Sequence, residues 1–495
     1  MYARRVKRVK KSEHSARQRR PTVVSYRPTL VCLPERTQGP RARAGMTMSL
    51  LLTALSVALL SVGMFEVSRV LGEAGYMDEV FHVPQAQAYC QGQYWVWNEK
   101  ITTFPGLYLF SSGVYRILQQ VAECDANFLR FGNALFVALT FYGCVLCRRR
   151  LVRERNDDAV LYALMITTFP LSAFYYFLYY TDTASTCLVV LTYYTSLRAA
   201  EQDGGLLPQL GVLVVSAAAV SVRQTNAVWL LFFAGTNMLS RLQRRGQVGK
   251  DESFSSSSTS AFLVQLQSFV LALLQNAVPL LLANAGLLLT VLGFVAFVVR
   301  NGGVVVGDKE NHRPALHLAL PLHMTAAATV VASLPRLFSS PTVRRGLSSF
   351  SLPTAALASA ALVWGSLEHP FLLADNRHLT FYLWRRALRF PAVRALLGPV
   401  YSSLLSALVG QSPGSLWLAI FAAAAVISLA PSPLLELRYF TPGIVVFLLN
   451  APPLKDGHGL AITVVVFLLI NACLLFVFLY RPFLWPDGST ARFML

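Results

Sequence analysis

The sequence is poor in charged residues and poorest in acidic ones. Only 14% of its 495 residues are Asp, Glu, Lys or Arg, whereas 55% are hydrophobic; an ordinary soluble domain has about a quarter of its residues charged. The 24 acidic side chains are outnumbered by 43 Lys and Arg, which gives a formal net charge of +19. So few charges among so many apolar residues argue against a soluble protein, and the composition predicts a membrane protein.

Metal-binding motifs and glycosylation sequons are absent. The seven cysteines are scattered, and no histidine pair completes a zinc site, so we predict no metal. CVLC at 144–147 ends a predicted membrane span, where packing is the simpler explanation. Cys90 and Cys124 fall on the same predicted side of the membrane, which leaves a disulfide between them open. Without an Asn-x-Ser/Thr sequon, glycosylation gives no check on topology.

Much of the positive charge lies in residues 1–45, a stretch with several prolines and no helical periodicity. We predict a basic disordered cytosolic tail that helps to orient the first span. Its basic region is too long for a signal peptide. A nucleic-acid partner would need a folded surface, which the tail does not indicate, so no nucleic-acid partner is predicted.

The rest of the chain, 46–495, is predicted to be an all-α polytopic membrane domain with about 12 to 14 transmembrane helices, because each crossing needs about 20 mostly apolar residues. The candidate spans lie near 47–65, 128–147, 159–178, 184–198, 207–222, 227–240, 277–299, 316–334, 352–366, 393–410, 415–431, 438–451 and 460–480.

The basic loops set the orientation. Loops rich in Lys and Arg at 148–155, 241–250 and 335–346 fall on the side of the amino terminus and are predicted to be cytosolic. Residues 241–276, with their serine-rich stretch, read as a cytosolic linker. The other side receives a long first loop at 66–127, which we expect to be lumenal.

One basic segment does not fit this orientation. RRALRFPAVR at 385–394 follows a loop placed on the lumenal side. We expect an interfacial amphipathic helix with its cations at headgroup level, and the alternative is a span count that is off by one.

The unusual polar chemistry begins in GYMDEVFHVPQAQAYC, residues 75–90. Asp78 and Glu79 lie among aromatic residues such as Tyr76 and Phe81, which suggests a loop packed on protein. A carboxylate in a partly dry site has a raised proton affinity and suits general-base catalysis. A structural role for the pair is equally open at this point.

Cations gather at the same outer ends of the spans. They are Arg223, Lys309, Arg377 with His378, and Arg438. Guanidinium groups match phosphate oxygens, and such contacts strengthen where water is scarce. Each cation alone is explained as a snorkelling anchor, but together they favour binding of an anionic lipid headgroup.

A transporter or scaffold is the competing class. Transporters usually place ionisable groups near the bilayer midplane, whereas the predicted spans here are nearly free of charge at mid-span. The outer loops hold the polar groups, which favours an enzyme acting on a lipid-borne substrate.

Several motifs carry a resemblance to a known family. They are YMDEVFHVPQAQAYC with ITTFPGLYLFS, SVRQTNAVW at 221–229, GDKENHRPALH at 307–317, HPFLLADNRHLTFYLWRR at 369–386, LLELRYF at 434–440 and PDGSTARFML at 486–495. In this order they resemble the dolichyl-phosphate-glucose-dependent alpha-1,2-glucosyltransferases of the endoplasmic reticulum. The resemblance runs from about residue 47 onward and leaves out the basic tail and the serine-rich stretch.

The resemblance implies a multispanning glycosyltransferase of GT-C architecture in the endoplasmic reticulum membrane, with a lumenal active site and a cytosolic amino terminus. Its donor is dolichyl phosphate glucose and its acceptor the diglucosylated dolichyl-diphosphate oligosaccharide. No cofactor or metal is implied, and the bilayer is the other partner. Another polyprenyl-phosphate-sugar transferase of this architecture remains the alternative.

The family's beta-linked donor and alpha-linked product imply inversion, hence one in-line displacement with a single base. The first lumenal loop supplies that base, Asp78 or else Glu79, with Glu79 favoured to orient the acceptor or to hold the loop. For the donor phosphate we expect Arg377 and His378, with Arg438, Lys309 and Arg223 as further candidates.

Sugar-binding candidates come from these motifs and from the first loop between them. They are Tyr76, His82, Gln85, Gln87, Trp95, Trp97, Gln224, Asn226, Asp375 and Asn376. Loop packing is the alternative for His82 and the two glutamines of the first loop, and an interfacial aromatic belt is the alternative for the tryptophans.

Overall fold

The computed structural model describes residues 40–152, 156–202, 205–251, 259–337, 344, 346–347, 351–454 and 457–495. The chain divides into Met1–Arg43 and Ala44–Leu495, and the second unit holds nearly all of these residues. Within them the structure is helical apart from one small hairpin, so the all-α prediction is confirmed. Most of the predicted tail, residues 1–39, lies outside the described residues, but 40–45 already belong to the first helix.

The helices of the first half, in chain order, are α1 (Pro40–Leu71), α2 (Glu79–Cys90), α3 (Gly106–Leu118), α4 (Ala126–Leu151), α5 (Asn156–Thr167), α6 (Pro170–Ala173), η1 (Phe174–Phe177), α7 (Thr181–Glu201), α8 (Leu206–Val222) and α9 (Asn226–Arg244). Those that follow are α10 (Thr259–Gln275), α11 (Ala277–Ala283), α12 (Ala285–Asn301), α13 (Ala319–Ser333), η2 (Leu334–Arg336) and α15 (Leu352–Trp364).

The last part holds α16 (Pro370–Ala374), α17 (Leu379–Leu383), the π-helical turn η3 (Trp384–Leu388), α18 (Pro391–Leu396), α19 (Gly398–Val409), α20 (Ser415–Leu429), η4 (Leu437–Phe440), α21 (Thr441–Asn450) and α22 (His458–Tyr480). The hairpin pairs β1 (Phe483–Leu484) with β2 (Thr490–Ala491), antiparallel.

Four described helices are long and apolar enough to cross a membrane: Thr47–Leu71, Ala126–Leu151, Pro391–Val409 and His458–Tyr480. Two bent pairs of helices, 158–177 and 259–283, raise this number to six if each pair is one span, and five shorter apolar helices accompany them. The chain is therefore a polytopic membrane protein, while the total of 12 to 14 crossings stays a prediction.

Three sequence predictions on elements need correction. The stretch 241–276 is not one linker, because 259–275 forms the apolar helix α10; residues 252–258 lie outside the described part. Residues 385–394 are not one interfacial helix, since η3 ends at Leu388 and a new helix begins at Pro391, whose ring nitrogen cannot donate to the preceding turn. The predicted span 159–178 breaks for the same reason at Pro170.

The first loop is built from α2 and α3. Asp125 caps α4 by accepting a hydrogen bond from the backbone of Phe128, and a disulfide joins Cys90 at the end of α2 to Cys124 just before that cap. The disulfide that the sequence left open is thus present. At Gly106, α3 approaches α8 so closely that a Cβ would collide with Ser221.

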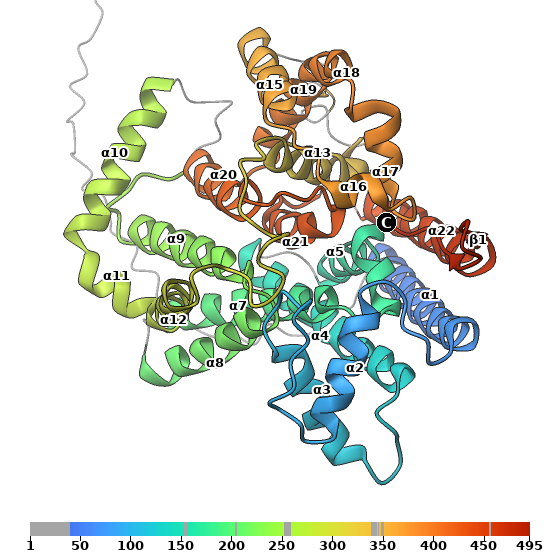
Figure 1. Cartoon of the computed structure of the whole chain (residues 1–495). Helices are drawn as coiled ribbons and strands as arrows, with labels where there is room; N and C mark the ends of the chain where they lie inside the picture. Colours follow the sequence, from blue (N-terminus) through green and yellow to red (C-terminus); the bar gives the residue numbers. More distant parts are fainter. Residues whose placement is uncertain are drawn as a thin grey trace, which may run out of the picture. The chain divides into compact units, whose positions relative to one another are not determined.

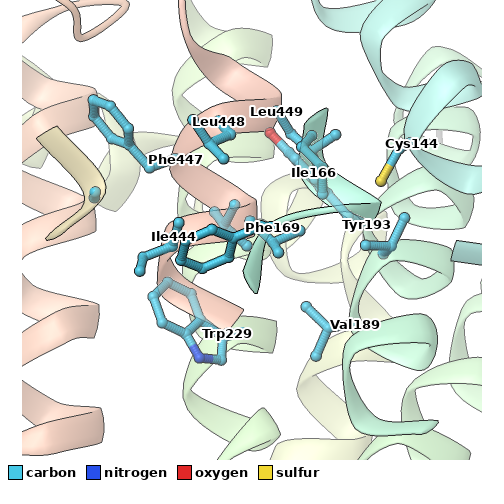
Figure 2. Packing of buried hydrophobic residues seen from close by; sticks show 14 of the residues in the cluster. Cys144, Ile166, Phe169, Val189, Tyr193, Trp229, Ile444, Phe447, Leu448 and Leu449 are labelled. Carbon is cyan, nitrogen blue, oxygen red and sulfur yellow. The ribbon is translucent and has the colours of Figure 1, made fainter. Parts of the chain in front are cut away.

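The centre of the described fold is α21, every residue of which is buried. It contacts α4, α5, α7 and α13. Figure 2 shows Ile444 of α21 beside Trp229 of α9 and Phe169 from the break after α5, whereas Phe447 points to the other side of α21, where its ring lies 5.6 Å from that of Phe421. Because lipid is itself apolar, such packing is held by close van der Waals contact rather than by exclusion of water. The buried α21 gives a rigid base to η4, the turn directly before it.

Candidate active site

Asp78 occupies the N-cap position of α2, and its carboxylate makes no capping hydrogen bond. Asp is among the preferred residues at this position, so a carboxylate turned away from the helix end is notable. The preceding Met77 has φ of 56°, a left-handed conformation that a non-glycine residue adopts at a cost. The backbone N–H of Asp78 donates to the hydroxyl of Tyr180 at 3.0 Å. These constraints direct the carboxylate to a cation instead.

That cation is Arg438 on η4. Its Nη1 donates to Asp78 Oδ2 at 2.9 Å, and its Nε donates to the carboxylate of Glu436. The same Nη1 lies 3.8 Å from Asp182 Oδ2. The side chain of Arg438 is 14% exposed, against 36% for Asp78. A nearly buried arginine is therefore surrounded by three carboxylates, of which Asp78 is the most exposed.

Asp182, in the first turn of α7, is a site residue that the sequence analysis missed. Its Oδ1 accepts from Arg223, while its Oδ2 is buried and has no hydrogen-bond partner among the described residues. Arg223 was a candidate, but its acidic partner, 41 positions earlier, was not. The available signal was that Asp182 is an isolated acidic residue at the outer end of an apolar span.

The segment 375–379 forms the opposite wall. Arg377 pairs with Asp375 through Nε and Nη2, each 2.8 Å from a carboxylate oxygen. His378 Nε2 lies 3.8 Å from the same carboxylate. The guanidinium of Arg377 also stacks over Trp485 at 4.5 Å. Arg377 and His378, both expected at the donor phosphate, thus lie together.

A cavity of about 360 Å³ brings these groups to one place. Its wall is made by Met77, Asp78, Phe371, Leu372, Ala374, Asp375, Arg377, His378, Thr380, Leu434, Leu435, Glu436 and Trp485. It combines three carboxylates (Asp78, Asp375 and Glu436), the basic side chains of Arg377 and His378 and an apolar rim, which suits a polar ligand carried on an apolar chain.

The charge environment of Asp78 differs from the sequence expectation. Burial raises the pKa of Asp78, but the charge and hydrogen bond of Arg438 outweigh it and hold the pKa below its ordinary value of 3.8. The predicted rise in proton affinity is therefore wrong, because a buried cation 360 positions away was not visible locally. Asp78 is ionised at neutral pH.

Glu79 lies on the other side of the α2 start and is fully buried. Its oxygens accept from the backbone N–H groups of Tyr76 and Tyr179 at 3.0 and 2.6 Å, and from two nitrogens of Arg130 at 2.9 and 2.7 Å. With no oxygen facing the cavity, this arrangement supports the alternative that Glu79 holds the loop.

His82 is buried within the first loop, and its Nδ1 shares a hydrogen bond of 2.5 Å with the hydroxyl of Tyr108. Burial lowers the pKa of His82 below its ordinary value of 6.5, and Arg438 adds to this effect, although Asp78 opposes it. His82 is therefore neutral at neutral pH.

Most other sugar-binding candidates do not line the cavity. Gln85 and Gln224 bond backbone groups of the first loop. Asn226 bonds Ser185 and the end of α8. Trp97 packs on Tyr108, whereas Trp95 is 81% exposed. The remaining ones are Gln87, half-buried on α2, and Asn376, which accepts from Trp485.

Lys309 is likewise separate from the cavity. Its Nζ donates to the backbone and side-chain oxygens of Asn301 at 2.8 and 2.9 Å. Among the described residues, no group of three or more His, Cys, Asp or Glu side chains is arranged to hold a metal ion.

Residues near 490–495 brace the site, a role the sequence analysis did not assign. The Tyr76 hydroxyl donates to Arg492 O and accepts from Arg492 N. Met494 pairs with the 377–379 segment through two backbone hydrogen bonds. The hydroxyl of Tyr175, whose ring lies 5.9 Å from the Arg438 guanidinium, donates to Leu495 O. One extended segment thereby ties both walls of the cavity together.

Residues 73–449 match the DIE2/ALG10 family. The chain belongs to the DIE2/ALG10 family. The match covers Asp78, Asp182, Arg377 and Arg438, so the whole charged cluster lies inside the family region.

Two mammalian relatives of this DIE2/ALG10 chain are closely similar. It is 34% identical over 460 residues to the mouse protein named Dol-P-Glc:Glc(2)Man(9)GlcNAc(2)-PP-Dol alpha-1,2-glucosyltransferase, covering 86% of this chain and 94% of that one. A human protein of the same name is 33% identical over 461 residues with the same coverage. A solved oligosaccharyltransferase from Archaeoglobus fulgidus is 14% identical with a TM-score of 0.34, covering 84% of this chain and 52% of that one.

Proposed function

We propose that this chain transfers glucose from dolichyl phosphate glucose to the diglucosylated dolichyl-diphosphate oligosaccharide, forming a terminal alpha-1,2 linkage. The donor and acceptor are those in the names of its family relatives. The observation that carries the proposal is the Asp78–Arg438 pair on the wall of the cavity, because it joins an ionised base to a cation.

Asp78 is the base of this reaction. The acceptor 2-hydroxyl oxygen attacks the anomeric carbon of glucose and forms the new C–O bond, while the bond from that carbon to the phosphate oxygen breaks. The bonding electrons leave with dolichyl phosphate, and the hydroxyl proton passes to the Asp78 carboxylate. A carboxylate of low pKa can accept this proton, because the acceptor hydroxyl becomes strongly acidic as its oxygen bonds to the anomeric carbon.

The leaving phosphate is stabilised by the basic side chains of the opposite wall. Arg377 and His378 line the cavity. The pairing of Arg377 with Asp375 keeps its planar fork oriented, and the phosphate takes over part of that pairing when it binds. Because phosphate is a weak base, cationic stabilisation suffices and no general acid is needed. Arg438 and Arg223 add positive charge behind the cavity wall.

The membrane position follows from this assignment. The enzyme acts in the endoplasmic reticulum membrane with the cavity on the lumenal side and the amino terminus in the cytosol. The basic loops support this orientation, as do the cavity residues Met77, Asp78 and Trp485, which follow the ends of α1 and α22 in the chain. The donor chain stays in the bilayer while both sugars meet in water.

The test uses purified full-length protein in lipid nanodiscs. Dolichyl phosphates charged with glucose, mannose or galactose are offered with the diglucosylated acceptor, and we expect transfer from the glucose donor alone. Transfer from a different sugar instead would favour another polyprenyl-phosphate-sugar transferase. No transfer from any donor would overturn the enzyme assignment.

Asp78→Asn tests the base. We expect the rate to fall by about 10² to 10⁴, the usual contribution of a positioned base. Glu123→Gln is the control, because Glu123 is an exposed carboxylate in the same loop. Native transfer rates in Asp78→Asn would refute the base assignment.

A further inference from the structure

A second cavity of about 450 Å³ adjoins the catalytic one and shares Ala374 and Trp485 with it. Its other wall residues are Leu373, Asn376, Phe381, Pro486 and Asp487. The two cavities together form a path that leads from Asp78 over the indole of Trp485 to the turn of the β1–β2 hairpin.

The indole of Trp485 is held in place on this path. Its Nε1 donates to Asn376 Oδ1 at 2.9 Å, and the Arg377 guanidinium stacks on the ring at 4.5 Å. The hairpin fixes the backbone, since Trp485 N donates to Ser489 O at 2.9 Å and Gly488 takes a left-handed φ of 81° at the turn. A rigid aromatic platform of this kind binds at little cost in side-chain entropy.

Polar groups flank the indole of Trp485, and some of their atoms are available for hydrogen bonds to a ligand. Asp487 Oδ1 accepts from the backbone and hydroxyl of Ser489 at 2.9 and 2.6 Å, whereas its Oδ2 accepts from no other residue in the described part of the chain. Hydrogen bonding to Ser489 keeps the pKa of Asp487 below 3.8, so the carboxylate is ionised. The Nδ2 of Asn376 is likewise without an acceptor in the described part of the chain.

This combination selects a sugar rather than a phosphate. A pyranose has an apolar C–H face that packs on an indole and hydroxyls at its edge that donate to a carboxylate or accept from an amide. The walls of the second cavity hold no Lys or Arg, and Asp487 repels an anion. The phosphate-binding groups are confined to the first cavity.

We propose that the second cavity is a subsite for the acceptor oligosaccharide, occupied by sugars beyond the one that reacts. This inference rests on the proposed function. The hairpin follows Tyr480, where the membrane-spanning α22 ends, so the path leads out of the bilayer. A large hydrophilic glycan requires such an exit, whereas the isoprenoid chain of the donor does not.

The experiment compares two acceptors on the full-length enzyme in nanodiscs. One carries the complete oligosaccharide and the other only its terminal glucose residues on the same lipid. We expect wild-type enzyme to prefer the complete acceptor through a lower KM. In Asp487→Asn and Trp485→Phe we expect this ratio of the two KM values to shrink by about tenfold. That is the effect of losing one hydrogen bond to a charged group, or a contact of similar strength with the indole.

The control is Leu484→Ala, on the same hairpin, because Leu484 is 72% exposed and lines neither cavity. Its preference should match the wild type. A wild-type preference retained in both Asp487→Asn and Trp485→Phe overturns the subsite. An equal rise in KM for both acceptors also overturns it, since the variants would then act on the reacting sugar.

A binding measurement separates this inference from the proposed function. The free oligosaccharide Glc(2)Man(9)GlcNAc(2), the glycan in the relatives' names, is followed by saturation-transfer NMR on wild type and Asp487→Asn. A weakened signal in the variant supports the subsite even if no transfer is found. An undiminished signal refutes the subsite even if transfer proceeds.

Discussion

Asp78 and Glu79 are adjacent in sequence and have opposite surroundings. The Asp78 carboxylate lies on the cavity wall beside Arg438, whereas every oxygen of Glu79 is engaged by Arg130 and by backbone N–H groups. The sequence drew attention to the pair because carboxylates are rare in this chain. The family resemblance favoured Asp78 as the base and Glu79 as the group that orients the acceptor or holds the loop, but the residues alone left a structural role for the pair open, since Arg438 and Arg130 come from distant elements.

At the residue scale, Glu79→Gln should destabilise the fold. It leaves Arg130, whose side chain is 4% exposed, without its counter-charge. Removing one member of a buried ion pair costs about 3 to 5 kcal/mol. We expect a lowered unfolding temperature of the detergent-solubilised protein.

The control for this variant is Glu66→Gln, because the Glu66–Arg69 pair lies at the surface of α1 and such pairs contribute little. Unfolding of Glu79→Gln at the wild-type temperature would contradict the structural role.

The low pKa of Asp78 predicts the pH dependence. A carboxylate with a pKa below its unfolded value is stabilised in its charged form; its contribution to stability is present above about pH 4 and is lost as the pH falls through the lower folded value. We therefore expect kcat/KM to show no acidic limb between about pH 5 and pH 8. An apparent pKa near 6 to 7 in that profile, with proton uptake traced to Asp78, would show instead a raised proton affinity.

At the element scale, the segment after α22 acts as a brace. Arg492 donates to the carbonyls of Phe478 and Leu479 at 3.0 and 2.7 Å, which caps α22 and fixes the backbone that bonds Tyr76. Arg492→Gln should loosen the 377–379 wall and raise the KM for the donor by about tenfold, with a smaller effect on kcat.

Arg492→Lys should restore part of the affinity, because it keeps the charge near the carbonyls. Arg481→Gln is the matched control, since Arg481 is exposed at the end of the same helix. Equal effects of Arg492→Gln on both kinetic constants with no rescue by lysine would indicate a general loss of structure.

The disulfide belongs to the same scale. It links α2 to the loop before α4 across 34 positions. Replacing Cys90 and Cys124 together by serine should lower the free energy of unfolding by about 2 to 4 kcal/mol. Thermal unfolding with and without a reducing agent measures this, with the exposed thiol variant Cys473→Ser as control. If the reducing agent still lowers the unfolding temperature of the double variant, the loss of stability is due to other cysteines.

At the scale of the whole molecule, the orientation in the membrane can be tested directly. The chain has no natural sequon, so an inserted Gly-Asn-Gly-Thr-Gly segment is an unambiguous reporter. We expect glycosylation when it follows Gln120 in the first loop and none when it follows Arg245 after α9. A mobility shift removed by a glycosidase is the readout, and the reverse pattern would place Asp78 on the cytosolic side.

The sequence by itself determined a polytopic helical membrane protein, because crossing lipid requires apolar residues in number and composition alone reports them. It also determined that Asp78, Arg377 and Arg438 were worth attention, since isolated charges in an apolar chain need a reason. The sequence predicted the helix boundaries less accurately. It missed α10, and breaks at Pro170 and Pro391 divide two helices that it predicted as continuous.

Only the tertiary structure decided which charges meet. Arg438 is 360 positions from Asp78, and the Asp182 beside it comes from a third element. An ion pair depends on a separation of a few ångströms, and no local pattern encodes that distance between helices so far apart in the chain. The direction of the Asp78 pKa, the burial of Glu79 and the platform at Trp485 all follow from these long-range contacts.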